Sequence, residues 1–461
     1  MSLVSLLSIA RTALLAQQRA MSVTGQNVAN AQTPGYTRQV LDLHAADPLW
    51  TPHGTVGTGV EAGAVVRMRD TLLDTAYRRS AGGLGSATTR QGTLTQVQNA
   101  VNEPSDTGVA AALDQMFAAF GDLATDPASR TSRNLVLDKA QTLVDRLHTL
   151  AASLAGTAQD TATAMKNQAA QVNDLTRRIG ELNTRILAAG GPEHSAPDLE
   201  DQRDVLIDQL SGMVPTQVIQ HTDGTIAIAV GDTLLVDGAN TKTLDVRAAA
   251  GGGSTVGVTG DPNPLDLGNT GSLGALVQLS TVTLPGQQAQ LDQFASALAT
   301  EVNALHRTGY TPAGATGIDF FDPAGTTAAS IRLSAAVQGN PDSIAASSGA
   351  AGSDGDLALQ MAGLGNQPVA SLGGLTLRGA YDAFATGVAS SVQQAGQDVD
   401  TQQALTDNAD AQRQSANGVS VDEEMTVLIA QQQAYSAAAR LVQTANDMIT
   451  EVLNMVGTSG T

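Results

Sequence analysis

The stretch LVSLLSIARTALLAQQRAMSVTGQNVANAQTPGY, residues 3–36, decides the fold of this chain. Its apolar residues recur at three- and four-residue spacing, which is typical of an amphipathic helix that pairs with another helix. Such a helix would contain about 30 residues and span roughly 45 Å. The large apolar members of its seam are Leu3, Leu7, Leu14, Met21 and Val28.

Polar residues replace the apolar ones where this helix ends. Asn27 and Asn30 carry amide side chains, and Thr33-Pro34-Gly35 follows directly. Proline disfavours helix at the residue before it and glycine frees the backbone, so we expect the helix to stop here. An amide on a buried seam needs a hydrogen-bond partner. We therefore predict that this helix is incomplete alone and that other segments or other copies complete it.

The C-terminal end repeats the pattern. Ser420 can cap a second helix, and the acidic run from Asp422 favours the positive end of its dipole. The seam selected by the same spacing contains Val421, Met425, Leu428, Tyr435, Val442, Asn446, Ile449 and Leu453. Two such helices at opposite ends of one chain bury their seams by pairing with each other or with other copies. The alternative is two unrelated surface helices on a globular core.

The pattern of apolar and polar residues changes several times in the middle of the chain. Residues 37–80 alternate apolar and polar with many glycines, which predicts strands or a long hairpin. Helical spacing dominates residues 84–190, 199–212, 272–306 and 376–417, while residues 215–267 contain short β-rich pieces with turn signals such as Asp223-Gly224. The elements are therefore nested, with the termini outermost in sequence and a β insertion at the centre.

This nesting predicts a mainly α, elongated multidomain rod with an inserted β domain. We expect three parts: a terminal coiled coil of residues 1–35 plus 419–461, a helical bundle of residues 36–214 plus 268–418 that includes a β hairpin region near 37–80, and a small β domain of residues 215–267.

Composition excludes several classes of function. The chain has 461 residues, a formal net charge of −20 and no cysteine. The acidic balance argues against a nucleic-acid partner, and the lack of cysteine excludes disulfides and thiolate metal sites. No apolar run approaches the roughly 18–20 residues of a membrane span, and no cleaved signal pattern is convincing. We therefore expect no membrane insertion, and either a cytoplasmic protein or one exported without a cleaved signal.

The sequence offers no pattern for catalysis. Gly57, Gly59 and Ala62 fit G-x-G-x-x-A, but they lie within alternating β sequence with no helix following directly. The six histidines are scattered without metal-ligand spacing, and no nucleophile elbow or P-loop occurs. We therefore predict no catalytic, cofactor-binding or metal-binding residue and no cofactor.

The terminal motifs resemble those of a known family. Residues 25–39, GQNVANAQTPGYTRQ, are similar to the signature of bacterial flagellar rod, hook and hook-associated proteins. That signature falls on Asn27, Asn30, Thr33, Gly35 and Tyr36. Matches at NEPSDTG (102–108), 199–214, 271–325 and 415–456 are specific to the hook-associated protein 1 family and cover nearly the whole chain in order. Only residues 326–372 occupy the place of a large outer insertion in longer relatives, so we expect that insertion to be absent or reduced.

The resemblance implies a non-enzymatic structural subunit of the extracellular flagellum that forms the hook–filament junction and is required for filament attachment. It implies that the terminal helices form an inner coiled-coil tube in a helical ring of copies. The implied partners are hook protein on one side, hook-associated protein 3 on the other, a cytosolic export chaperone at the C-terminal helix and the flagellar type III export apparatus.

Two other interpretations remain open from the sequence. The chain could be another axial protein, such as hook or distal rod, although the 102–108 motif and the long C-terminal match argue against this. It could also be a secreted adhesin or an enzyme with a coiled-coil stalk. That function would require converging polar groups in the β insertion, and the sequence gives no sign of them.

Overall fold

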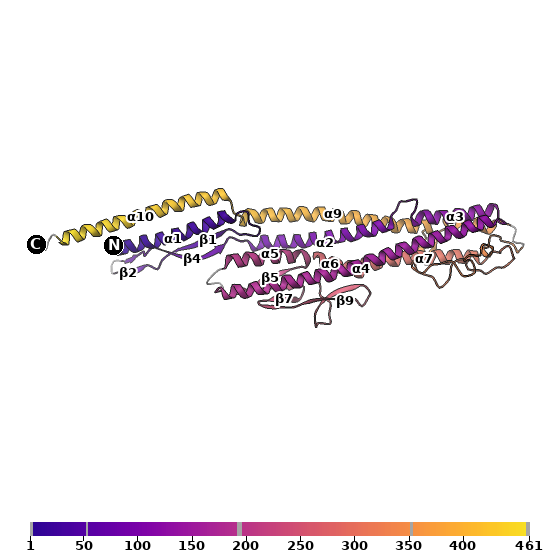
Figure 1. Cartoon of the computed structure of the whole chain (residues 1–461), viewed down its shortest axis with the longest axis horizontal. Helices are drawn as coiled ribbons and strands as arrows, with labels where there is room; N and C mark the ends of the chain where they lie inside the picture. The colour runs from indigo at the N-terminus through magenta and orange to yellow at the C-terminus, as the bar shows by residue number, and fades with distance from the viewer. Residues whose placement is uncertain (1–2, 52–53, 191–195, 351–353, 458–461) are drawn as a thin grey trace.

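The chain folds into an elongated rod whose helices run along one long axis (Figure 1). The structure is a computed structural model and describes residues 3–51, 54–190, 196–350 and 354–457. Both chain ends lie at the same end of the rod (Figure 1). The predicted mainly α, elongated fold with a small β domain is confirmed.

Helices α1 (Leu3–Asn30) and α10 (Val421–Gly457) lie antiparallel, side by side, at this end (Figure 1). A β arm formed by residues 39–51 and 54–67 runs back along α1. In it β1 (Gln39–Ala45) pairs with β4 (Val60–Arg67), and β2 (Leu49–Thr51) pairs with β3 (Gly54–Val56), all antiparallel. Gly59 has φ +118°, and a Cβ there would lie 2.3 Å from Thr12 Oγ1. Glycine therefore lets the arm lie directly against α1.

The predicted β region is wrong for its last ten residues. Alternation ends with β4, and helix α2 (Thr71–Val101) begins where strands were expected. The Asp70 side chain accepts hydrogen bonds from the backbone N–H groups of Leu72 and Leu73 and caps the helix. This cap, rather than hydrophobic periodicity, marks the boundary.

Long helices make the rest of the rod. Helix α2 lies beside α9 (Leu377–Asn417), and α4 (Arg130–Ala188) contains 59 residues, or roughly 88 Å of helix. The remaining helical elements are α3 (Val109–Thr125), α5 (Pro197–Met213), α6 (Gly271–Gln278), the π-helical η2 (Leu279–Thr283), α7 (Leu284–His306), η3 (Pro341–Ser343), α8 (Asp356–Leu364) and η4 (Ala370–Leu372). Because α4 runs along most of the bundle, it contributes to both hydrophobic cores.

One hydrophobic core lies toward the end of the rod opposite the chain termini, and we call it the distal core (Figure 1). It is formed by α3, the first half of α4, α7 and the start of α9. Its large buried residues include Leu113, Met116, Phe120, Leu143, Leu147, Phe294, Phe320 and Phe321. The weakly patterned residues 326–372 add buried side chains to this core, among them Ile331, Val337, Ile344 and Met361. This segment thus packs against the bundle through turns and the short helical elements η3, α8 and η4, which are too short to give a clear periodicity.

The second hydrophobic core, nearer the chain termini, is called the proximal core. It joins the second half of α4, α5 and α6 to the small β domain. Strands β5 (Gln217–Gln220), β6 (Ile226–Val230), β7 (Thr233–Asp237) and β8 (Asn240–Thr241) form one antiparallel sheet, and β9 (Leu244–Ala248) pairs with β10 (Ser254–Val258). The buried Asn183 of α4 donates to the carbonyls of Ile226 (3.0 Å) and Gly238 (2.8 Å). These bonds fix the β domain on the side of the bundle.

His306 is buried in the distal core as a neutral imidazole. Its Nδ1 donates to the Ile318 carbonyl at 2.7 Å, and its Nε2 accepts from the Ala345 N–H at 2.9 Å. Burial lowers the pKa of His306 below its ordinary value of 6.5, more than the Ile318 carbonyl and Asp319 raise it. Protonation would also convert the accepting Nε2 into a donor that faces another donor.

We expect acid to destabilise the distal core through His306. The unfolded chain binds a proton below about pH 6.5 while the folded chain does not, so this stabilisation is lost as pH falls below 6.5. The slope should reach at most about 1.4 kcal/mol per pH unit. Hydrogen exchange of the Phe320 and Phe321 amides between pH 7.5 and 5.0 measures it. His306→Gln keeps a donor and an acceptor but cannot titrate, so an equal slope in that variant would contradict the assignment.

Candidate assembly site: the terminal helix pair and its polar anchor

Small side chains form the buried contact of α1. Ala10, Ala16 and Ala20 are at most 5% exposed. On α10 the most buried apolar residues are Ala438 and Ala445, again at most 5% exposed. Helices with alanine at their contact can approach closely, but each alanine buries little apolar area. The helix pair is therefore closely packed with a modest hydrophobic contribution.

The predicted seam residues divide between buried and exposed positions. Leu3, Leu7, Leu14, Met21 and Val28 of α1 are half-buried, as are Leu428, Val442 and Ile449 of α10. The predicted seam residues Val421, Met425, Tyr435, Asn446 and Leu453 are exposed in the single chain and do not pack against α1, so their role in assembly stays a prediction. The buried positions of α10 are instead Glu424, Ala438 and Ala445, with Gln431 half-buried. Three- and four-residue spacing fits both the exposed and the buried positions of α10. Spacing and residue size therefore did not identify the small buried residues Ala438 and Ala445.

Asn27 is the most fully bonded residue at the end of the helix pair. It is 1% exposed. Its Nδ2 donates to the Gln39 carbonyl and to Glu424 Oε2, both at 2.9 Å. Its Oδ1 accepts from the Gln39 N–H at 3.0 Å and the Tyr36 hydroxyl at 2.9 Å. One amide thus joins the end of α1, the start of β1 and the first turn of α10.

The other motif residues shape the linker that follows α1. Asn30 bonds only locally, donating to the Gln26 carbonyl and accepting from Thr33 Oγ1. Gly35 has φ +80°, and a Cβ there would lie 2.3 Å from Val205 Cγ2 of α5. Burial, with nearby Asp198, Asp201 and Glu424, raises the pKa of Tyr36 to about 12 and keeps its hydroxyl a donor. The motif therefore directs the chain across α5.

A row of carboxylates on α5 receives the linker and the β arm. We call Asp201, Asp204, Asp208 and their arginine partners the polar anchor. Asp201 Oδ2 accepts from the Thr37 N–H at 3.1 Å. Arg67 at the end of β4 contacts Asp201 at 2.9 Å and Asp204 at 2.7 Å. The linker after α1, through Thr37, and the end of the β arm, through Arg67, therefore both bond to α5.

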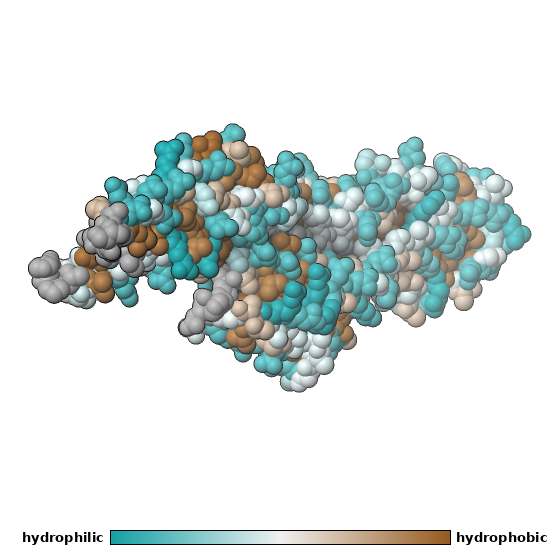
Figure 2. Space-filling model, turned by 60° about the vertical axis from the view of Figure 1, so that its left-hand side comes forward, coloured by the Kyte–Doolittle hydropathy of each residue, from teal (hydrophilic) through white to brown (hydrophobic). Residues whose placement is uncertain are grey.

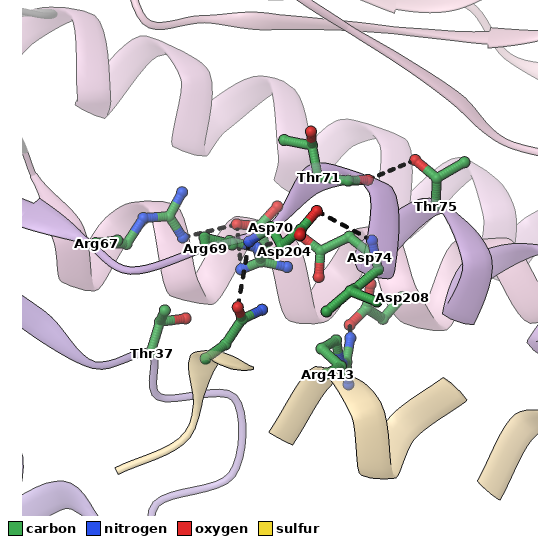
Figure 3. A network of polar contacts seen from close by, with 12 residues as sticks. Thr37, Arg67, Arg69, Asp70, Thr71, Asp74, Thr75, Asp204, Asp208 and Arg413 are labelled. Atoms are coloured by element: carbon green, nitrogen blue, oxygen red, sulfur yellow. Dashed lines mark hydrogen bonds and ion pairs between the residues drawn. The ribbon is translucent and has the colours of Figure 1, made fainter. Parts of the chain in front are cut away.

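Three further arginines complete the polar anchor. Arg69 contacts Asp204 at 2.6 Å, and Arg78 of α2 contacts Asp208 at 2.7 Å. Arg413 near the end of α9 contacts Asp208 at 2.5 Å. Figure 3 shows Asp204 beside Arg67 and Arg69, and Asp208 beside Arg413 of α9. Although burial alone would raise it, Arg69, Arg67 and Arg78 hold the pKa of Asp204 below its usual range.

The polar anchor was not predicted from the sequence. Glu200, Asp204 and Asp208 are four residues apart and so lie on one helical face, while Arg67 and Arg69 are two apart on an extended segment. Those spacings were the available signal. Nothing in the sequence said that the two segments meet.

A hollow lies on one side of the linker. A hollow of about 650 Å³ between the linker and α4–α5 is lined by residues that include Tyr36, Arg178, Glu181 and Asp198. Its described lining contains no histidine, serine or cysteine. Within the ranges that the structure describes, no group of three or more histidine, aspartate or glutamate side chains could hold a metal ion. Among those residues, every helix is too short or too polar to cross a membrane.

Protein-family models match most of the chain. The model described as flagellar hook-associated protein FlgK helical domain matches residues 94–321. The models for the C-terminal region of flagellar basal body rod FlgEFG proteins and for flagella basal body rod proteins match residues 411–455 and 7–37. The last two matches contain most of each terminal helix, and the first contains much of the bundle and the β domain.

Whole-chain comparisons agree. The chain is 30% identical to flagellar hook-associated protein 1 of Bacillus subtilis over 510 aligned positions, covering 98% of each protein. It is 29% identical to flagellar hook-associated protein 1 of Salmonella typhimurium over 69% of this chain and 59% of that protein. The fold is similar to that of the flagellar hook junction protein FlgK from Burkholderia pseudomallei, with a TM-score of 0.65 at 17% identity, over 75% of this chain and all of that one.

We predict that Asn27→Asp opens the contact between α1, β1 and α10. An aspartate cannot donate to the Gln39 carbonyl and would face Glu424, so the local free energy of opening should fall by at least about 2 kcal/mol. Hydrogen exchange of the Gln39 amide measures this change. Asn30→Asp is the matched control, because its bonds are local, and it should have a much smaller effect. Equal effects of the two variants would refute the role of Asn27.

We also predict that Asp204→Asn weakens the attachment of the β arm and α2 to α5. Three guanidinium groups would lose their shared charge partner in a largely buried site, which should cost about 3 kcal/mol. The urea midpoint of the full chain measures the loss. Asp342→Asn is the control, because Asp342 and Arg130 form an exposed pair at 3.9 Å and should contribute less than about 0.5 kcal/mol. The prediction fails if both variants unfold at the same urea concentration.

Proposed function

The chain belongs to the flagellar hook-associated protein 1 family, and from this premise we propose how it acts. It is a structural protein of the bacterial flagellum at the hook–filament junction. We propose that it assembles there with copies of itself through α1 and α10, that filament attachment requires it, and that it catalyses no reaction. The full-length similarity to hook-associated protein 1 is the observation that carries this proposal.

The surface of the terminal helix pair supports self-assembly. Helix α10 leaves large apolar residues exposed along its length, including Ile429 (52%), Leu441 (45%) and Leu453 (65%). Figure 2 shows hydrophobic surface at the end of the molecule that holds the chain termini. An exposed apolar face of this extent is typical of a protein–protein contact. The predicted residues Val421, Met425, Tyr435, Asn446 and Leu453, which do not bury against α1, are therefore proposed as contacts with other copies.

We propose where each of the other partners contacts the chain. Hook protein would contact the ring of copies on one side and hook-associated protein 3 on the other. Before assembly, a cytosolic export chaperone would cover the apolar face of α10, and the flagellar type III export apparatus would export the chain without cleavage of a signal. The exposed apolar residues of α10 support a chaperone site, because such a face would otherwise promote premature association.

We also propose a division of the chain into structural parts. The terminal helix pair, residues 1–35 plus 419–461, would form the inner tube. Residues 36–214 plus 268–418 would form the next shell, and residues 215–267 would project as a spacer. The outer insertion of longer relatives would be absent or reduced at residues 326–372, which is consistent with the 59% coverage of the Salmonella protein.

Deletion and complementation test the proposal. In a flagellated host that lacks its own hook-associated protein 1, the full chain should restore filaments and swimming. A variant that lacks residues 421–457 should leave hooks without filaments and release flagellin into the medium, because it lacks α10. Electron microscopy and immunoblots of the medium measure both results. Circular dichroism of the truncated protein should still show a folded bundle; normal filaments on the truncated variant would refute the proposal.

A further inference from the structure

An exposed ridge on α1 has a composition unlike the rest of the surface. Arg11, Leu15 and Arg19 are four residues apart, so they follow one another along one side of the helix. All three are exposed, and Leu15 is 51% exposed. Within the described part of the chain neither arginine forms an ion pair. Helix α1 contains no acidic residue. We call these three residues the α1 ridge.

Helix α10 carries a second apolar stripe that does not face α1. Val427, Ala434, Leu441 and Met448 are seven residues apart, and all are exposed. Seven-residue spacing places side chains on nearly the same line of a helix and is typical of a coiled-coil contact. The buried positions Ala438 and Ala445 lie on a separate line. The α10 stripe, defined by these four exposed residues, is therefore built to pack against another helix.

Acidic side chains accompany the α10 stripe near its C-terminal part. Asp447 and Glu451 lie beside Met448 in the sequence, are exposed, and form no ion pair within the described residues. The α10 helix contains five carboxylates and one arginine. The α1 ridge thus has the order cation, apolar, cation, and this part of α10 offers carboxylates around an apolar side chain. The two surfaces are complementary in charge and in hydrophobicity.

The two surfaces do not meet within one subunit. Asn27 contacts Glu424, and the helices are antiparallel, so Leu15 is level with residue 436 of its own α10. Met448 lies twelve residues farther along, or about 18 Å. Both surfaces are also exposed instead of turned toward each other. A contact between them therefore requires a second copy of the chain.

We propose that the α1 ridge of one copy docks on the α10 stripe of a neighbouring copy, with Leu15 against Met448 and Arg11 and Arg19 beside Glu451 and Asp447. The inference rests on the proposed self-assembly through the terminal helices and specifies its contact. Copies related by rotation and translation along one axis point the same way, so the two helices run antiparallel. The contact is heterologous, since different surfaces meet, and its axial offset of about 18 Å between contacting helices makes it repeat along a helical array of copies.

Photo-cross-linking from Leu15 identifies what covers the ridge. The full chain with a benzoylphenylalanine at position 15 is expressed in the flagellated host that lacks its own junction protein, and assembled flagella are irradiated. We expect an adduct between residue 15 and residues 441–452 of a second copy. An adduct with another protein or another segment, or no adduct in cells that carry filaments, overturns the inference.

Engineered disulfides test the register, because the chain contains no cysteine. We expect the Leu15→Cys/Met448→Cys variant to form multimers of the chain on oxidation of assembled flagella. Each single variant and the Leu15→Cys/Val427→Cys pair, displaced by 21 residues or about 32 Å, should give at least tenfold less. Equal yields for the two pairs overturn the proposed register.

A charge exchange tests the ion pairs and separates this contact from the function as a whole. Arg11→Glu/Arg19→Glu should lower the fraction of cells with filaments at least tenfold, and Asp447→Lys/Glu451→Lys added to it should restore filaments. Arg79→Glu, an exposed arginine of α2, is the control and should have no effect. No loss in the double variant, or no restoration in the quadruple variant, overturns the contact. Failure of the unmodified chain to restore filaments would instead overturn the proposed function.

Discussion

The ion pairs between the carboxylates of α5 and four arginines determine how the parts of this molecule are arranged. Asp204 and Asp208 contact arginines from the β arm, the start of α2 and the end of α9. Those segments are the ones that connect the terminal helix pair to the bundle. Buried ion pairs contribute little net stability, because each charge loses its hydration. Their value here is geometric, since charges that need several partners are satisfied in only one arrangement of the segments.

Much of the fold could be predicted from periodicity. The terminal helices, the Thr33-Pro34-Gly35 break, the β insertion and the long helix at 377–417 all have strong local signals. What could not be predicted depends on contacts between distant segments. Asp70 begins a helix inside an apparently alternating region, and Ala438 and Ala445 are more buried than the larger Met425 and Leu453. Size and spacing alone do not show which of two apolar stripes faces a partner in the same chain.

The motif around Asn27 illustrates the same limit at the candidate site. The sequence identified the amides as unusual, and the resemblance connected them with assembly. The structure gives them different tasks: Asn27 joins three elements of its own chain, whereas Asn30 bonds within the end of α1. The polar residues at this end of α1 therefore hold together segments of the subunit itself.

The two connections between the helix pair and the bundle lie next to each other. The β arm continues into α2 through residues 68–70 and α9 continues into α10 through residues 418–420, and the Asp70 N–H donates to Asn417 Oδ1 at 3.2 Å. A domain attached by one connecting segment can rotate about its single bonds. A domain attached by two adjacent connecting segments cannot rotate without crossing them. Two adjacent connecting segments therefore restrict twisting of the terminal helix pair relative to the bundle more than they restrict bending about an axis through both segments.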